Sequence, residues 1–548
     1  MTDLEKGGLP SHEAGPPPDV SHPNLDPSQA TDYTNAVKQQ SRKESPFQEQ
    51  LSNTNSTPSH HDITPTTEGG SPLTPTRAQR FRSEMRRITM HFTPSWFSCV
   101  MGTGTVSVLL HQLPYQFTGL GVISNVIFGF NILLFLLFLG ISIARYVIWP
   151  QLFWIMLFHP TQSLFLGAFV IGMSALISMC AVSAAPACGG GFTTFTWVFW
   201  WINAALALVV CVGLPFVQFT RHVQSLDKIT AVWMLPVVST IVCSATGGLV
   251  AEILSPAHAR LTLFACYVLW GTGFGMAFLL MSLYYARQAI YKIPPAQVIT
   301  SAFLPIGPCG QGAFGLLQFA SVLYDLYQKD GTALVSPKVS DAETPRIMAT
   351  AIYAVSVPIA LVIWGLGLVW LILAVSSMVD LWLVSKLTFN LGWFALVFPI
   401  GTMAAAAIKF GAMLDSGGFR VIGTVLALIV LLLWIFVSVM TMGKAFRGDI
   451  FFSPCLAEMC DERGEPLNYV PPARKYQYQA RPTTNNTFDG NYEDADADRA
   501  ASRSRSRFRG RLGGEMALSR ARKWIAATAS SSTSPAGRSR SRGRRANS

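Results

Sequence analysis

The chain has polar tails around a long apolar middle, which breaks into runs of about twenty residues. Runs of this length, coiled as helices, match the hydrocarbon thickness of a bilayer. Five of them share one design, in which a bulky apolar residue shortly before a proline is followed by a segment rich in Gly, Ser, Thr and Ala. The prolines, 66 to 94 residues apart, are Pro94, Pro160, Pro236, Pro305 and Pro399. The recurrence predicts a repeated helical hairpin.

Longer and more uniformly apolar runs separate these proline-containing segments. They cover about residues 119–145, 195–219, 260–286, 346–376 and 419–443. Together the two sets predict an all-α, polytopic membrane protein with ten transmembrane helices. Because proline removes a backbone hydrogen bond and bends a helix, we expect the odd-numbered helices to be kinked and to line a pore.

The ninth of these segments, residues 389–414, carries the most specific signals. Pro399 lies near its middle, bulky Phe398 comes directly before it, and Gly401 and four alanines follow. We interpret Phe398 as a pore gate, although most phenylalanines in membrane helices serve packing alone. Lys409 is a cation deep in an apolar run, which is costly unless it faces water or a partner. It therefore either attracts anions or reaches to the outer membrane surface.

Glycines and a further proline extend the set of candidate pore-lining and kink residues. They are Gly102 and Gly104 in the first proline-containing segment and Pro308, Gly310 and Gly312 in the seventh span. Residues 310–315, GQGAFG, match the dinucleotide-binding pattern GxGxxG letter for letter. No predicted strand precedes them, so we expect close helix packing and a narrow path instead.

Composition and charge divide the chain into three parts. Half of the 548 residues are hydrophobic and 13% are charged, and much of the net charge of +11 lies in the tails. We expect disordered tails at residues 1–85 and 448–548 around a transport domain at 88–447. Arginines before the first span place both termini in the cytoplasm by the positive-inside rule. The C-terminal Arg-Ser tracts suggest contact with anionic lipid, with RNA binding as the alternative; we predict no nucleic-acid partner.

Residues typical of enzyme chemistry are sparse in the predicted spans. All nine histidines lie at or before His258, and HExxH and GxxxxGK[ST] patterns are absent from the sequence. The chain is therefore predicted not to be an enzyme and to bind no metal or cofactor. A path lined by small residues and exposed backbone dipoles favours anions. With a negative cytoplasm, the membrane potential drives such anions outward.

Three segments together resemble a known family. They are FTPSWFSCVMGTGTVSVLLHQLPY (residues 92–115), KIPPAQVITSAFLPIGPCGQGAFG (292–315) and FNLGWFALVFPIGTM (389–403). They are similar to fungal sulfite efflux pumps of the tellurite-resistance/dicarboxylate transporter family, which includes the slow-type anion channel of plant guard cells. The resemblance implies five helical hairpins around a central pore, with odd helices inside and even helices outside, as a homotrimer. It also implies a gating phenylalanine that matches Phe398.

The implied function is export of sulfite or bisulfite across the plasma membrane. A C4-dicarboxylate (malate) carrier of the same fold is the alternative, but two carboxylates would call for a cationic clamp, and the proline-containing segments hold no intramembrane arginine. A different class, a membrane receptor or scaffold whose tails bind partners, would require the tails for function.

Overall fold

The computed structural model describes residues 77–222, 224–334, 343–448, 450, 451, 453 and 456. Every regular element in these ranges is helical, and eight helices are long and apolar enough to cross a membrane. The predicted all-helical, multi-pass membrane class is therefore confirmed. The predicted tails lie largely outside the described residues, although helix α3 (Arg77–His91) begins before the expected boundary at residue 85.

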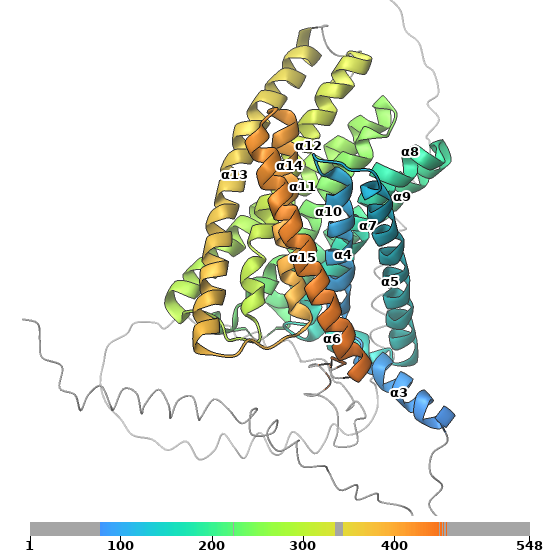
Figure 1. The fold of residues 1–548 in the computed structure, drawn as a ribbon, viewed down its shortest axis with the longest axis vertical. Coiled ribbons are helices and arrows are strands. Elements are labelled where there is room, and N and C mark those ends of the chain that lie inside the picture. Colours follow the sequence, from blue (N-terminus) through green and yellow to red (C-terminus); the bar gives the residue numbers. More distant parts are fainter. Residues whose placement is uncertain are drawn as a thin grey trace, which may run out of the picture. The chain divides into compact units, whose positions relative to one another are not determined.

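Two kinds of long helix build the bundle (Figure 1). The inner helices are α4 (Phe97–Gln112), α7 (Leu166–Met179), α10 (Leu235–Glu252), α12 (Ile306–Asp330) and α14 (Phe394–Met413). The outer helices are α5 (Leu120–Ile148), α9 (Gly190–Thr220), α11 (Pro256–Tyr291), α13 (Glu343–Val384) and α15 (Gly417–Arg447). In the spans that contain α7, α10 and α14, 72% to 100% of residues are buried, against 17% to 33% in the outer helices. Most of each apolar outer helix is therefore at least partly exposed, and an exposed apolar surface suits contact with lipid.

The inner helices form a closed ring. Helix α4 contacts α7, α7 contacts α10, α10 contacts α12, α12 contacts α14, and α14 returns to α4. Each outer helix packs on the inner helix that precedes it in the chain, as α5 does on α4 and α15 on α14. The ring therefore encloses an axis that lipid does not reach.

Tryptophans of the outer helices join the members of the ring. Each tryptophan donates its indole N–H to the next inner helix around the ring, which is not the inner helix that precedes its own outer helix in the chain. The bonds run from Trp200 to the Cys243 carbonyl (2.9 Å), Trp270 to the Gly312 carbonyl (3.0 Å), Trp364 to the Met403 carbonyl (3.2 Å) and Trp434 to the Thr103 hydroxyl (3.0 Å). The last bond joins α15 to α4 and so closes the ring between the two ends of the domain. A buried indole N–H needs such a partner, which fixes the rotation of each outer helix.

The prolines correct one expectation from the sequence. Four of the five prolines lie where an inner helix begins and do not kink it. Pro94 opens the 3-10 turn before α4, Pro160 lies in the turn that leads to α7, Pro236 is the second residue of α10, and Pro305 directly precedes α12. Pro308 is the third residue of α12, where its missing N–H costs no helical hydrogen bond. Pro399 alone of this set lies inside a helix, α14, beyond its first turn.

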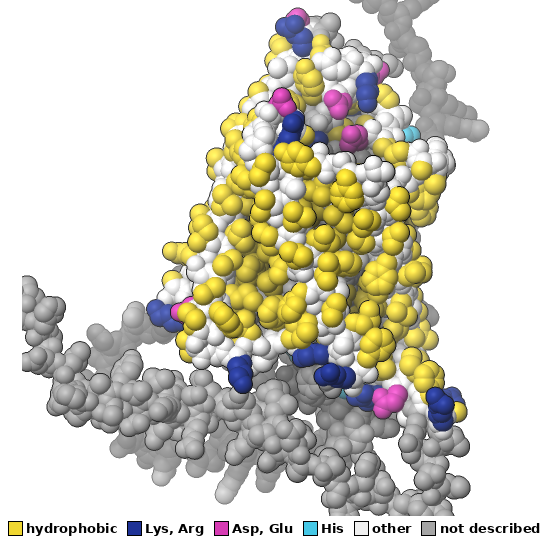
Figure 2. Space-filling model, in the orientation of Figure 1, with side chains coloured by type: hydrophobic (Ala, Val, Ile, Leu, Met, Phe, Trp, Pro, Cys, Tyr) yellow, Lys and Arg dark blue, Asp and Glu magenta, His cyan; other side chains and the backbone are white. Residues whose placement is uncertain are grey.

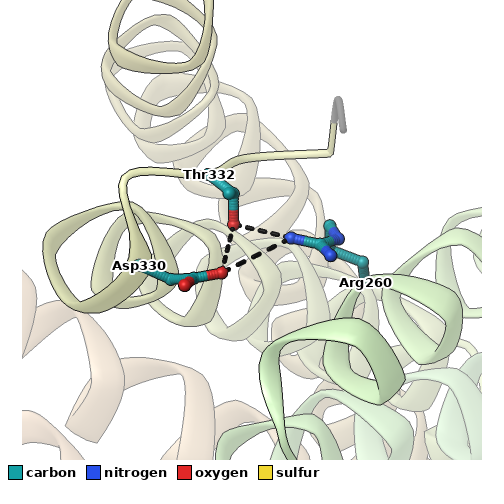
Figure 3. A network of polar contacts seen from close by, with 3 residues as sticks. All are labelled: Arg260, Asp330 and Thr332. Atoms are coloured by element: carbon teal, nitrogen blue, oxygen red, sulfur yellow. Dashed lines mark hydrogen bonds and ion pairs between the residues drawn. The ribbon is translucent and has the colours of Figure 1, made fainter. Parts of the chain in front are cut away.

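The two ends of the bundle differ in charge. Figure 2 shows a broad hydrophobic band. Lys and Arg outnumber acidic side chains at the end nearest α3 and α6 (Gln151–Phe158), and the two signs of charge are mixed at the other end. At the mixed end, Arg260 of α11 contacts Asp330, the last residue of α12, and Thr332 just after it, with Nη1 2.7 Å from the Thr332 hydroxyl (Figure 3). At the basic end, Phe451 stacks on Trp96, so residues just beyond the predicted boundary at 448 pack on the bundle.

Candidate functional site

A vestibule of about 420 Å³ lies at the basic end of the ring, where the inner helices begin. Each inner helix is preceded by a short 3-10 turn. The residues that cap these five turns all line the vestibule: Thr93, Gln162, Thr230, Val298 and Asn390. Helix N-termini carry unpaired N–H groups and a partial positive charge. Their convergence makes the vestibule favourable for anions.

Lys444 adds a full positive charge to the vestibule. It comes from the last turn of outer helix α15, and its Nζ donates to the Phe389 carbonyl at 3.0 Å and lies 5.5 Å from the Phe389 ring centre. Among the described residues that line the vestibule, Lys444 carries the one charged side chain. Sequence reasoning did not single it out; its position at the end of the last apolar run was the available signal.

A second, smaller cavity of about 50 Å³ lies further along the axis of the ring. All five inner helices contribute to its wall, which includes Thr105, Gln112, Ser178, Thr246, Gln311, Phe398, Gly401 and Thr402. A volume of this size holds no more than a few water molecules. The axial space at this level is therefore much narrower than the vestibule.

Phe398 of α14 lies toward the vestibule end of the small cavity. Its side chain is 4% exposed and lines the small cavity, whereas Ala395, one turn earlier, lines the vestibule. A Cβ built on Gly307 of α12 would lie 3.6 Å from Cε1 of the Phe398 ring and 4.0 Å from Val238 of α10. The ring therefore fills the space between α14, α12 and α10, which the missing side chain at Gly307 leaves open.

Hydroxyl groups of the small cavity already donate their protons to the protein. Thr105 donates to the Met101 carbonyl (2.8 Å) and Thr402 to the Pro399 carbonyl (2.7 Å). An anion binds to hydrogen-bond donors, and these hydroxyl groups have no free proton to donate to it. The amide N–H groups of Gln112 and Gln311 are donors too, and neither side chain has a hydrogen-bond partner among the described residues. Gln311 lies within the GQGAFG segment. The sequence analysis identified the two glycines beside it, Gly310 and Gly312, but did not identify Gln311 as a cavity residue.

The predicted glycines serve mainly as contact points between helices. A Cβ on Gly310 would meet Thr402 and lie 2.6 Å from the backbone nitrogen of Met403, and one on Gly104 would lie 2.6 Å from Cβ of Ala175. Gly102 faces Phe394, Gly312 faces Phe274 of α11, and Gly401 faces Thr105. Of the predicted site residues, the structure places Phe398 and Gly401 in the wall of the small cavity.

Lys409 lies near the opposite end of α14 and is half-buried. The negative charges of Glu252 on α10 and Asp325 on α12 both act on it, and Gln318 donates to the Glu252 carboxylate at 3.0 Å. The lysine charge is thus partly offset by acids. In the described part of the chain, no group of three or more His, Cys, Asp or Glu side chains has the arrangement of a metal site.

A ring of buried helices inside a shell of apolar outer helices, with a positively charged vestibule at one end, defines a polytopic membrane protein with the features of an anion transporter. The chain belongs to the voltage-dependent anion channel family SLAC1, whose sequence profile matches residues 91–442. The chain is 38% identical to a sulfite efflux pump of Arthroderma benhamiae and to one of Trichophyton rubrum, over 66% of this chain and 92% of each relative. It is 27% identical to a malic acid transport protein of Schizosaccharomyces pombe, over 66% of this chain and 80% of that relative.

Proposed function

We propose that this protein exports sulfite or bisulfite through the axis of its inner ring, with Phe398 as the gate. The observation that carries the proposal is the closed ring itself, with five helix N-termini around one vestibule and a buried phenylalanine beyond it. The 38% identical relatives are sulfite efflux pumps, which supports sulfite as the anion. Transport removes sulfite from the cell and so detoxifies it.

The membrane arrangement that fits this function has ten transmembrane helices in five hairpins. Helices α4 and α12 are the two inner members beyond the eight that qualify by length and apolarity. The basic end of the bundle faces the cytoplasm by the positive-inside rule, which places both termini there. We assign the protein to the plasma membrane as a homotrimer, with the apolar outer helices facing lipid and neighbouring protomers.

The membrane potential supplies the driving force in this proposal. Moving one negative charge outward from a negative cytoplasm gains about 2.3 kcal/mol per 100 mV. This energy corresponds to depletion of the anion by about fifty-fold at equilibrium. The walls favour a small anion over malate, because no charged side chain lines the small cavity among the described residues. A dicarboxylate would need cationic partners for both its ends.

Sulfite flux in proteoliposomes with an imposed potential tests the function directly. We expect the full-length protein to release internal sulfite at least about tenfold faster than protein-free vesicles, and faster with a negative interior. Malate added at equal concentration should not slow the release. Labelled malate flux that matches or exceeds sulfite flux would instead assign the protein to dicarboxylate transport, the function of its more distant relative.

We further propose that Lys409 attracts anions weakly at the outer mouth. Replacing it with glutamine is expected to lower sulfite flux by about two- to threefold, because Glu252 and Asp325 already offset part of its charge. Lys329→Gln is the matched control, since Lys329 is exposed at the same end of the bundle. Equal flux in the wild type and both variants would show that Lys409 only pairs with its acidic neighbours or reaches the membrane surface.

A further inference from the structure

Two buried polar side chains in the vestibule wall lack hydrogen-bond partners among the residues that the structure describes. The Ser301 hydroxyl belongs to a side chain that is 5% exposed, and the Gln162 amide oxygen to one that is 7% exposed. Both residues line the vestibule. Buried polar groups without partners destabilise a fold, so native proteins usually satisfy them with protein, water or ligand. Their shared location points to a ligand in the vestibule.

The chemistry around these two groups suits an oxyanion. A serine hydroxyl is a donor, and a half turn of an amide exchanges its N–H₂ and oxygen, so Gln162 can also present donors. Lys444 uses one of its three N–H groups on the Phe389 carbonyl, which leaves donors and a positive charge for a ligand. The described residues that line the vestibule include no Asp or Glu. A cation would therefore find no carboxylate there.

Three other polar side chains of the vestibule are already engaged within the protein. Asn390 donates to the Gln297 carbonyl at 2.8 Å and accepts from the Gly392 N–H at 2.8 Å. Thr93 and Ser95 share a hydrogen bond of 2.7 Å. The partial positive charge of the five helix N-termini acts on the whole space and adds to that of Lys444.

We propose that the vestibule contains a loading site that binds one small oxyanion, of the sulfite class, between Lys444, Ser301 and Gln162 before it reaches Phe398. This inference rests on the proposed function and adds a second binding position to it. A volume of about 420 Å³ is far larger than such an ion, so the ion keeps part of its hydration. The site raises the local anion concentration at the gate and leaves the rate of passage beyond it unchanged.

Removing the charge should therefore change the concentration dependence of transport. For Lys444→Gln, we expect the sulfite concentration for half-maximal efflux to rise by about tenfold, as for the loss of one charge-assisted hydrogen bond. The maximal flux should stay within about twofold of the wild type. Ser301→Ala should raise the half-maximal concentration by about three- to fivefold. Lys444→Arg keeps the charge and should behave like the wild type.

The experiment combines efflux with direct binding, using the full-length protein in proteoliposomes and in detergent. Lys386→Gln is the matched control, because Lys386 is exposed at the same end of the bundle and is not among the residues that line the vestibule. Calorimetric titration with sulfite at constant ionic strength should show weaker binding in Lys444→Gln and unchanged binding in Lys386→Gln and Lys444→Arg.

Two results would overturn the loading site. One is an unchanged half-maximal concentration and unchanged sulfite binding in Lys444→Gln; the other is an equal loss in Lys386→Gln, which would indicate a general surface-charge effect. Failure of the proposed function looks different, because the wild type itself would then move no sulfite. The titration would still decide whether the vestibule binds the ion.

Discussion

Replacing Phe398 with alanine is expected to raise sulfite flux at least about tenfold over the wild type. The ring is 4% exposed and fills the space between α14, α12 and α10, where the cavity along the axis measures about 50 Å³. Alanine removes the aromatic ring from the axis while Gly307 opposite offers no side chain to replace it. The vestibule would then be continuous with the small cavity.

A phenylalanine on the same helix provides the control for this prediction. Phe410 is also buried, but its ring packs against Trp364 of α13 and Phe419 of α15, at 6.3 and 5.1 Å between ring centres. Either Phe→Ala change should cost about 3–5 kcal/mol of stability. Phe410→Ala should therefore lower the yield of folded protein without increasing flux per molecule. Equal flux per molecule in both variants would reassign Phe398 to packing.

Replacing Gly310 with alanine is expected to cause a large loss of folded protein, because the added methyl group has no room in the inner ring. The added Cβ would meet Thr402 and lie 2.6 Å from the Met403 nitrogen and from the Thr402 carbonyl carbon. These are backbone atoms of α14, so no side-chain rotation relieves the clash. Overpacking of this kind costs about 1–3 kcal/mol or more. Helices α12 and α14 would have to separate, which opens the ring.

The control is Gly271→Ala in outer helix α11. Gly271 is also inside a helix, but a Cβ there meets no atom within 4 Å. We expect its melting temperature to equal or slightly exceed that of the wild type, since alanine favours helix by about 1 kcal/mol. Thermal melting monitored by size-exclusion chromatography in detergent measures both variants. Equal melting of Gly310→Ala and Gly271→Ala would show that α12 and α14 do not pack this closely.

Local features of the sequence were sufficient for the fold class and for part of the site. Hydrophobic runs of bilayer length predict helices without any knowledge of packing, because backbone groups in lipid must bond within their own helix. The recurring prolines marked the five inner-helix segments, although four of them lie where the helix begins and only Pro399 lies inside one. Phe398 was singled out by a local pattern too, a bulky residue before proline and small residues; the structure places it in the wall of the small cavity, and its role as a gate stays a prediction.

The helix rotations and the long-range contacts were decided by the tertiary structure alone. The local sequence does not show that Gly310 faces the backbone of α14 while its neighbour Gln311 faces the cavity. The rotation of α12 within the ring decides which way each residue points. Lys444 reaches the vestibule from the last outer helix and lines it together with Ser301 and Gln162, which lie more than 140 residues away in the chain. The sequence by itself determined a membrane protein of long apolar helices with a phenylalanine beside its proline. Which polar groups share a cavity depended on close packing between distant segments, because hydropathy records how apolar a helix is and not which of its faces meets a neighbour.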